Sequence, residues 1–238
     1  MSYTGMSYNI DIVMCIDGTE SMRPLLDMVK ANALRFPEDV AKAGECRGKH
    51  IDALRVKLIV FRDYLADGEN AMLMSDFLTL PEQSAEFERI VKGIEAKGGG
   101  GGLEDGLEAL GYAIKSKWTT GGAKRRHVIV VWTDAGTHDI GFGRDPGNGG
   151  YVGDQVRNNA AHYPRGMARS FEELSQWWGC GQGEGVMDRS ARLLIYAPMK
   201  DYWTTIAELW DNAIMFPSQA GKGLEETTYN EILFQIYR

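Results

Sequence analysis

The feature that most constrains the fold is the alternation of short apolar runs with amphipathic helical patterns. Continuous apolar runs rich in Val and Ile are typical of parallel strands covered on both faces. Strands that alternate with helices form βαβ units. The sequence therefore predicts an α/β fold with a Rossmann-like, doubly wound, mostly parallel sheet, helices on both faces and one antiparallel edge strand near residues 72–80. The apolar runs lie at residues 9–16, 55–61, 72–80 (the weakest), 127–133, 192–197 and 212–216.

Helical stripes with spacings of three and four residues fill the intervals between these runs. The longest stripe extends from Met22 to Val40, and Pro37 is expected to kink or break that helix near its end. Residues 136–166 have no regular pattern and are predicted to form a long loop, either a functional one or a disordered insertion. Shorter stripes predict helices around residues 87–94, 103–114, 167–178, 206–210 and 227–237.

Composition narrows the class of protein. Hydrophobic residues make up 44% of the chain and charged residues 25%, which is typical of a globular domain. We expect a tail at residues 1–7 and a single domain at residues 8–238. The net charge of −7 argues against a dedicated nucleic-acid binder. No apolar run is long enough to span a membrane, the first residues do not resemble a secretion signal, and three scattered cysteines fit a reducing compartment. We expect a cytoplasmic protein that binds neither nucleic acid nor membrane.

Carboxylates and hydroxyls gather directly after the strongest apolar runs. Asp17, Thr19 and Ser21 alternate after the first run, and Asp134 follows the run at 127–133. In a doubly wound sheet the carboxyl ends of the strands meet at one edge, where ligands bind. Oxygen groups that converge there suit a hard cation: Mg²⁺, Mn²⁺ or Ca²⁺. The alternative for the first loop is a plain helix cap, with Ser21 at the N-cap position.

Other polar groups at this edge are weaker candidates. Asp63 is expected to support a turn or to pair with Arg62 at the surface, and His138 with Asp139 either orients ligands or is exposed. The glycine run at residues 98–102 lacks both the lysine of a phosphate-binding P-loop and the spacing of a dinucleotide-binding loop. We therefore expect it to provide permissive backbone geometry beside the site.

The sequence DGTES at residues 17–21, joined to TDA at residues 133–135, resembles the metal-ion-dependent adhesion site of von Willebrand factor A domains. The resemblance covers nearly the whole chain from residue 8. It implies that Asp17, Thr19, Ser21 and Asp134 bind a divalent cation. Water completes the coordination shell, and one position stays open for an Asp or Glu of a partner protein.

The segment GGGGGLED at residues 98–105 resembles the middle loop of a subgroup of this family, in which a glutamate binds the metal. By this resemblance Glu104 is a fifth ligand; the alternative is a solvated glutamate in the first turn of a helix. Leu103 and Gly101 depart from the subgroup pattern, which argues against its flanking metal site. The combined motifs also resemble bacterial A-domain proteins of tellurite-resistance and stress or defence gene clusters. This implies a partner such as a kinase or phosphatase of the same cluster.

Three functions remain in competition. The first is a non-enzymatic, metal-dependent adaptor, which we favour because the sequence offers no nucleophile–base pair. The second is a phosphohydrolase of the haloacid dehalogenase type, because CIDGT at residues 15–19 superficially resembles DxDGT. Cys15 then stands where that chemistry needs a nucleophilic aspartate. The third is an A-domain scaffold that binds no metal.

Overall fold

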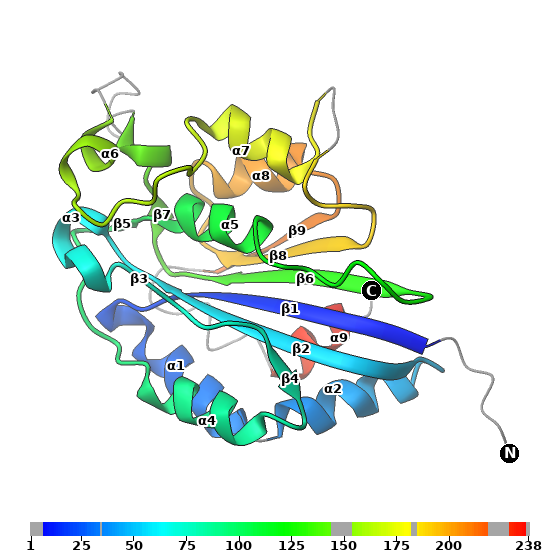
Figure 1. Ribbon diagram of the computed structural model, residues 1–238. Coiled ribbons are helices and arrows are strands. Elements are labelled where there is room, and N and C mark those ends of the chain that lie inside the picture. The colour runs from blue at the N-terminus through cyan, green and yellow to red at the C-terminus, as the bar shows by residue number, and fades with distance from the viewer. Residues whose placement is uncertain (1–6, 34, 144–153, 182–184, 219–228, 237–238) are drawn as a thin grey trace, which may run out of the picture.

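The computed structural model describes residues 7–33, 35–143, 154–181, 185–218 and 229–236 (Figure 1). Its main sheet has the strand order β3-β2-β1-β6-β8-β9, where β3 is Met72–Met74; β4 (Leu78–Leu80) also pairs with β2. The predicted doubly wound, mostly parallel sheet is confirmed. Residues 1–6 of the predicted tail lie outside the described residues. The parallel strands are β1 (Ser7–Asp17), β2 (His50–Phe61), β6 (Arg125–Trp132), β8 (Ala191–Ala197) and β9 (Ala213–Pro217).

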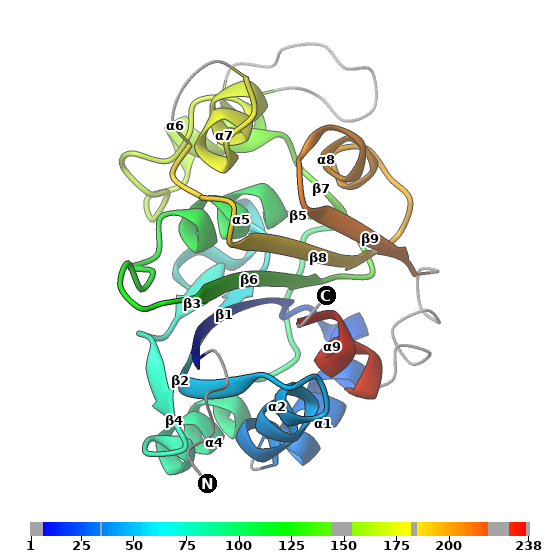
Figure 2. The same ribbon diagram turned by 90° about the vertical axis from the view of Figure 1, so that its right-hand side faces the viewer.

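Alternate residues of the central strand face opposite helical layers. Ile12 and Met14 of β1 pack with α1 (Arg23–Asn32), α2 (Phe36–Glu45), α4 (Ser84–Gly93) and α9 (Tyr229–Ile236). Val13 and Cys15 pack with α5 (Gly106–Ile114), α7 (Phe171–Trp178) and α8 (Trp203–Leu209). Successive side chains of a strand point to opposite faces, so a strand between two layers must be apolar throughout. Figure 2 shows the two layers on either side of the sheet.

The edge of the sheet beside β2 differs from the prediction. Two three-residue strands, β3 (Met72–Met74) and β4 (Leu78–Leu80), replace the single antiparallel strand expected over residues 72–80. Between them, the Leu58 N–H donates to Ser75 Oγ at 2.9 Å, and the Ser75 N–H donates to Leu58 O at 3.0 Å. A side-chain oxygen that takes the place of a backbone acceptor interrupts the ladder locally.

Two helices replace the single helix expected over residues 22–40. The helix α1 ends at Asn32, and α2 begins at Phe36 with Pro37 in its first turn. Proline has no N–H to donate, so the first turn, where that N–H would be unpaired, accommodates it. Pro37 therefore marks the start of a second helix rather than a kink near the end of one.

The region from residue 103 to 166 is more regular than expected. Leu103 lies outside α5, in the short strand β5 (Leu103–Glu104), which pairs in parallel with β7 (Gly136–Thr137). The turn η3 (Ile140–Phe142) and the helix α6 (Gln155–Asn159) give structure to parts of the predicted loop. Residues 144–153 of that loop lie outside the described residues. None of the helices that the structure describes is long and apolar enough to cross a membrane.

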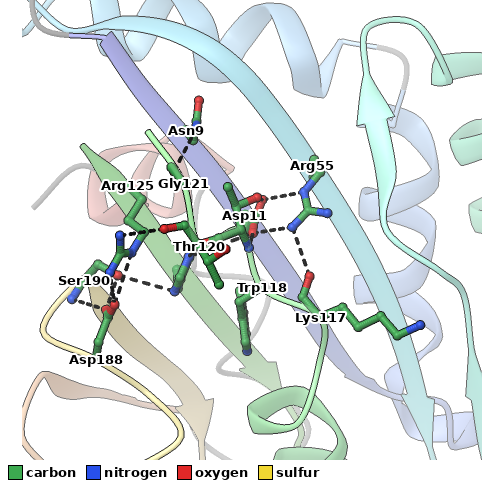
Figure 3. A network of polar contacts seen from close by, with 12 residues as sticks. Asn9, Asp11, Arg55, Lys117, Trp118, Thr120, Gly121, Arg125, Asp188 and Ser190 are labelled. Carbon is green, nitrogen blue, oxygen red and sulfur yellow. Dashed lines mark hydrogen bonds and ion pairs between the residues drawn. The ribbon is translucent and has the colours of Figure 1, made fainter. Parts of the chain in front are cut away.

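A buried ion pair fixes the segment between α5 and β6. Asp11 of β1 is 1% exposed, and its two carboxylate oxygens accept hydrogen bonds from Arg55 Nε at 2.8 Å and Nη2 at 2.6 Å. The Thr119 N–H donates to Asp11 Oδ2 at 2.7 Å. A buried carboxylate is stable only when it is paired in this way. The network lies near the amino ends of β1 and β6, away from the carboxyl ends of the strands (Figure 3).

Candidate metal centre

The loop after β1 holds three of the predicted ligands. Asp17 is fully buried at the end of β1, and its Oδ1 accepts hydrogen bonds from Thr19 N–H at 2.9 Å and Thr19 Oγ1 at 2.6 Å. Thr19 Oγ1 lies 3.3 Å from Ser21 Oγ. Ser21 lies within the turn η1 (Glu20–Met22), and its Oγ donates to Asp134 Oδ1 at 3.0 Å instead of capping a helix. The cap interpretation of Ser21 is therefore wrong, and these four residues form one cluster.

Thr133, the residue before Asp134, completes the surroundings of Asp17. Its Oγ1 donates to Asp17 Oδ2 at 2.6 Å and accepts a hydrogen bond from the Ala135 N–H at 3.0 Å. Both oxygens of the Asp17 carboxylate thus accept from hydroxyl groups. Thr133 belongs to the TDA motif, but its role in orienting Asp17 was not predicted.

Glu104 reaches the cluster from β5. Its side chain is 4% exposed, and within the described part of the chain its Oε2 has no hydrogen-bond partner. Burial, reinforced by the nearby carboxylates of Asp17 and Asp63, raises the pKa of Glu104 to about 8. The interpretation of Glu104 as a solvated first-turn residue is therefore wrong, because its side chain is buried.

The glycine run forms a wall of the cluster. A Cβ atom at Gly99 would lie 2.9 Å from Thr19 Cγ2 and 3.1 Å from Glu104 Oε1, and the φ angle of Gly99 is +104°. A Cβ atom at Gly100 would collide with the carboxylate of Asp63. Position 99 therefore requires a residue that tolerates a positive φ angle and has no Cβ atom, and only glycine does both. The expectation of permissive backbone beside the site is confirmed.

Asp63 and His138 form a pair behind Glu104. Asp63 caps the helix α3 (Tyr64–Asp67): its Oδ1 accepts from two backbone N–H groups of α3, at 2.6 and 3.0 Å. Its Oδ2 lies 3.4 Å from His138 Nε2. Burial disfavours ionisation of Asp63, but hydrogen bonds from His138 and α3 outweigh it and hold its pKa below the ordinary value. The expected supporting turn is confirmed, and a surface pair with Arg62 is wrong.

Arg62 is a buried brace and not a surface residue. It is 1% exposed, and its Nε donates to Gly18 O at 3.0 Å and to Lys97 O at 2.7 Å. Its terminal nitrogens donate at 2.8 Å to the carbonyl oxygens of Glu95 and Asn70, the latter in the turn η2 (Gly68–Asn70). Burial lowers the pKa of Arg62, while nearby carboxylates, Asp67 first, oppose that shift. The guanidinium thus joins the loop after β1 to the segment before the glycine run.

Burial disfavours the charged form of Asp17 as well as that of Glu104, although the guanidinium of Arg62 lies within electrostatic reach of both carboxyl groups. Burial raises the pKa of Asp17 to about 6, although hydrogen bonds from Thr133 and Thr19 oppose the shift. In the described part of the chain, no three or more His, Cys, Asp or Glu side chains are grouped so as to hold a metal ion. Asp17, Glu104 and Asp134 therefore do not form such a group by themselves, and a site built from the predicted set also needs the hydroxyl groups of Thr19 and Ser21.

The donor chemistry and spacing nevertheless fit a hard cation. Successive oxygens from Asp17 through Thr19 and Ser21 to Asp134 lie 2.6, 3.3 and 3.0 Å apart. Adjacent ligands of an octahedral Mg²⁺ lie about 3.0 Å apart, which follows from metal–oxygen distances of about 2.1 Å. The unpartnered Oε2 of Glu104 adds a further oxygen that a cation would satisfy.

Cys15 does not belong to this centre. Its side chain is fully buried in the layer under α5, and its Sγ donates to Ala109 O at 3.8 Å. Burial raises the pKa of the thiol far above its ordinary value. Only a thiolate is nucleophilic, so Cys15 cannot take the part of the aspartate that a haloacid dehalogenase uses.

No protein-family model matches the chain, and no curated protein matches it. Among solved structures, the pilus adhesin SpaC from Lactobacillus rhamnosus GG is similar over 96% of this chain and 31% of its own, with a TM-score of 0.55 and 11% identity. The vWF domain of the type V pili tip protein Mfa5 from Porphyromonas gingivalis has a TM-score of 0.37 and 19% identity, over 55% of this chain and 39% of its own. Proximal thread matrix protein 1 from the mussel byssus has a TM-score of 0.47 and 8% identity, over 98% of this chain and 49% of its own. This chain therefore spans between about a third and a half of these solved chains. Of the three, SpaC shows a shared fold.

Proposed function

We propose that the chain is a von Willebrand factor A-like interaction module without catalytic activity. It binds a carboxylate of a partner protein through a divalent cation, Mg²⁺ or in its place Mn²⁺ or Ca²⁺. The residues that would hold this cation are Asp17, Thr19, Ser21, Glu104 and Asp134. The observation that carries the proposal is Glu104 Oε2, which is buried without a partner beside the carboxylate of Asp17. A cation would satisfy that oxygen and neutralise the repulsion between the two acids.

The residues of the proposed metal centre have different roles. Asp17 and Glu104 supply buried negative charge, and Thr133 holds the Asp17 carboxylate in orientation. Ser21 is exposed and Asp134 is half-buried, so the cluster opens to solvent on their side. A bound cation supplies an electrophilic position that an Asp or Glu of a partner reaches from this side. A second acid near the ion lowers its net positive charge, so we expect a modest affinity for the partner carboxylate.

The proposed biological setting is a bacterial cytoplasm. A role in a bacterial stress or defence system, with a kinase or phosphatase as partner, rests on the resemblance of the motifs. A cytoplasmic location rests on composition, and the three free cysteines are compatible with it. SpaC, whose fold is shared, is a pilus adhesin, and adhesion is also a binding function.

Water-proton relaxation with Mn²⁺ tests the proposed function. Chelator-stripped protein is loaded with Mn²⁺, and acetate is added as the carboxylate probe, with acetamide as its uncharged control. We expect bound Mn²⁺ to enhance relaxation, acetate to reduce the enhancement by displacing water, and acetamide to leave it unchanged. Ser21→Ala should weaken Mn²⁺ binding, and Thr120→Ala, which removes an exposed hydroxyl elsewhere, should not. Equal responses to acetate and acetamide would contradict carboxylate binding, and no Mn²⁺ binding would favour a metal-free scaffold.

A further inference from the structure

Cationic side chains gather at the edge of the sheet opposite the candidate metal centre. They surround Tyr8, near the start of β1, and come from the beginnings of neighbouring parallel strands or the residues just before them. Tyr8 is nine residues from Asp17, so about 30 Å of strand separates the two ends at about 3.3 Å per residue. We call this group the basic patch; it consists of Arg47, Lys49, Lys124, Arg126 and Arg192.

Two lysines of the basic patch share one aromatic ring. Lys49 Nζ lies 5.4 Å from the centroid of the Tyr8 ring, and Lys124 Nζ lies 5.7 Å from it. Arg47 lies over a different ring, with its guanidinium carbon 4.6 Å from the centroid of Phe234 in α9. Such contacts attract cations to an aromatic face without neutralising them. Lys49 and Lys124 therefore converge on one ring.

Two arginines of the patch project from adjacent strands to the same face. The register places Val128 of β6 opposite Arg192 of β8, and Arg126 lies two residues before Val128. Both arginines are half-buried, and burial lowers the pKa of each. The neighbouring Arg125 points to the other face, where it pairs with Asp188 at 2.6 Å (Figure 3).

Among the described residues, three members of the patch have no comparable ion pair, although Arg192 Nη1 donates to the carbonyl oxygens of Arg189 and Ala191. Over the residues that the structure describes, no ion pair joins Lys124, Arg126 or Arg192 to a carboxylate. Burial lowers the pKa of Lys49, and the charges of the other four patch residues lower it further. Mutually repelling cations in a chain of net charge −7 create a local field opposite in sign to that of the whole molecule. A multivalent anion would relieve this repulsion.

We propose that the basic patch binds an oligophosphate anion, with the guanidinium groups of Arg126 and Arg192 as its main donors. Guanidinium forks match the geometry of phosphate oxygens and bind them with charge-assisted hydrogen bonds. Arg126 and Arg192 lie on adjacent strands, about 4.8 Å apart, so their two guanidinium groups can contact different phosphoryl groups of one anion. Inorganic tripolyphosphate and the triphosphate of a nucleotide offer this same chemistry.

Calorimetric titration of sodium tripolyphosphate tests the proposal. Divalent-free buffer is used, so that a metal ion at the opposite edge cannot capture phosphate and the result does not depend on the proposed metal centre. We expect the double variant Arg126→Gln/Arg192→Gln to bind at least tenfold more weakly than the wild type. The matched control Arg89→Gln/Lys92→Gln removes the same charge from two exposed residues of α4 and should change binding less than twofold. Binding should also weaken as ionic strength rises.

Several results would overturn the proposal. These are the absence of tripolyphosphate binding by the wild type, retained binding in the patch variant, and an equal loss in the control. A parallel titration with ATP shows whether the patch binds nucleotides or only the free inorganic anion. Comparable binding of ATP would extend the assignment to nucleotide triphosphates, and binding of tripolyphosphate alone would restrict it to the free anion. Tighter binding of a ten-nucleotide oligothymidylate would overturn it in favour of nucleic acid. If circular dichroism shows that the double variant is unfolded, Lys124→Gln, at an exposed position, should weaken binding about threefold, and no loss would refute the patch.

Discussion

The buried acids of the metal centre predict how the stability of the metal-free protein depends on pH. An acid with a higher pKa in the folded protein keeps its proton over a pH range where the unfolded chain has already lost it. The free energy of unfolding therefore falls as pH rises from the unfolded to the folded pKa. Glu104, with a pKa raised from 4.5 to about 8, makes this contribution across the neutral range.

The magnitude follows from the proton count. Each pH unit over which the folded state holds one extra proton lowers the free energy of unfolding by about 1.4 kcal/mol. Between pH 5.5 and 7.5, Glu104 should therefore contribute a loss of about 3 kcal/mol. Asp17, with a pKa raised from 3.8 to about 6, contributes mainly below pH 6. His127 acts in the opposite direction, because burial lowers its pKa and the unfolded chain then binds the extra proton.

Urea unfolding in EDTA at pH 5.5, 6.5 and 7.5, followed by tryptophan fluorescence, measures this slope. Glu104→Gln keeps the shape of the side chain and removes its titration, so the difference between wild type and variant isolates Glu104 from other groups. Glu69→Gln, at an exposed position, is the matched control. Saturating Mg²⁺ should remove the extra pH dependence of the free energy of unfolding that wild type shows relative to Glu104→Gln. At 100 times its dissociation constant, Mg²⁺ should also add about 2.7 kcal/mol of stability.

A specific result would refute this reasoning. If the stability difference between wild type and Glu104→Gln does not change with pH, Glu104 is ionised in the folded metal-free protein. The cost of ionising the buried Glu104, which a bound cation is expected to offset, would then be absent.

Three further predictions follow from the geometry. In calorimetry, Gly99→Ala should weaken Mg²⁺ binding at least fivefold more than Gly101→Ala. Both positions have a positive φ angle, but only a Cβ atom at Gly99 would contact Thr19, so equal losses of affinity would contradict the close contact. Thr133→Val should lower the free energy of unfolding by about 1–3 kcal/mol in urea titrations, because it removes the hydroxyl that donates to Asp17 Oδ2; an unchanged midpoint would count against that bond. Thiol labelling of the native protein should modify the exposed Cys46 rapidly and Cys15 only after unfolding, and rapid labelling of Cys15 would disprove its burial.

The fold class and the main ligand loop could be predicted because their signals are local. Apolar runs identify buried strands, and a parallel sheet brings the ends of those strands to one edge. Asp17, Thr19, Ser21 and Asp134 were therefore expected to lie together, and the hydrogen bonds that link them confirm their proximity.

Other features depend on partners that no local pattern shows. Arg62 binds backbone carbonyl groups 8 to 44 residues away, and any residue type can supply a carbonyl. Asp63 meets His138 across 75 residues of sequence, through the turn after β7. The available signal was the place of Arg62 at the end of an apolar run, where an unpaired charge would be costly. The interruption of the edge strand at Ser75, between β3 and β4, likewise arises from one side-chain contact, which a hydropathy pattern does not reveal.

We propose that the cluster at the carboxyl edge of the sheet binds a divalent cation. Calorimetric titration of Mg²⁺ and Mn²⁺ into chelator-stripped protein tests this proposal, with wild type beside Asp17→Ala and the exposed-site control Asp52→Ala. We expect one bound ion in the wild type and in Asp52→Ala, and none in an Asp17→Ala protein that circular dichroism shows to be folded. A wild type that binds neither ion, or binding that survives in Asp17→Ala, would contradict it.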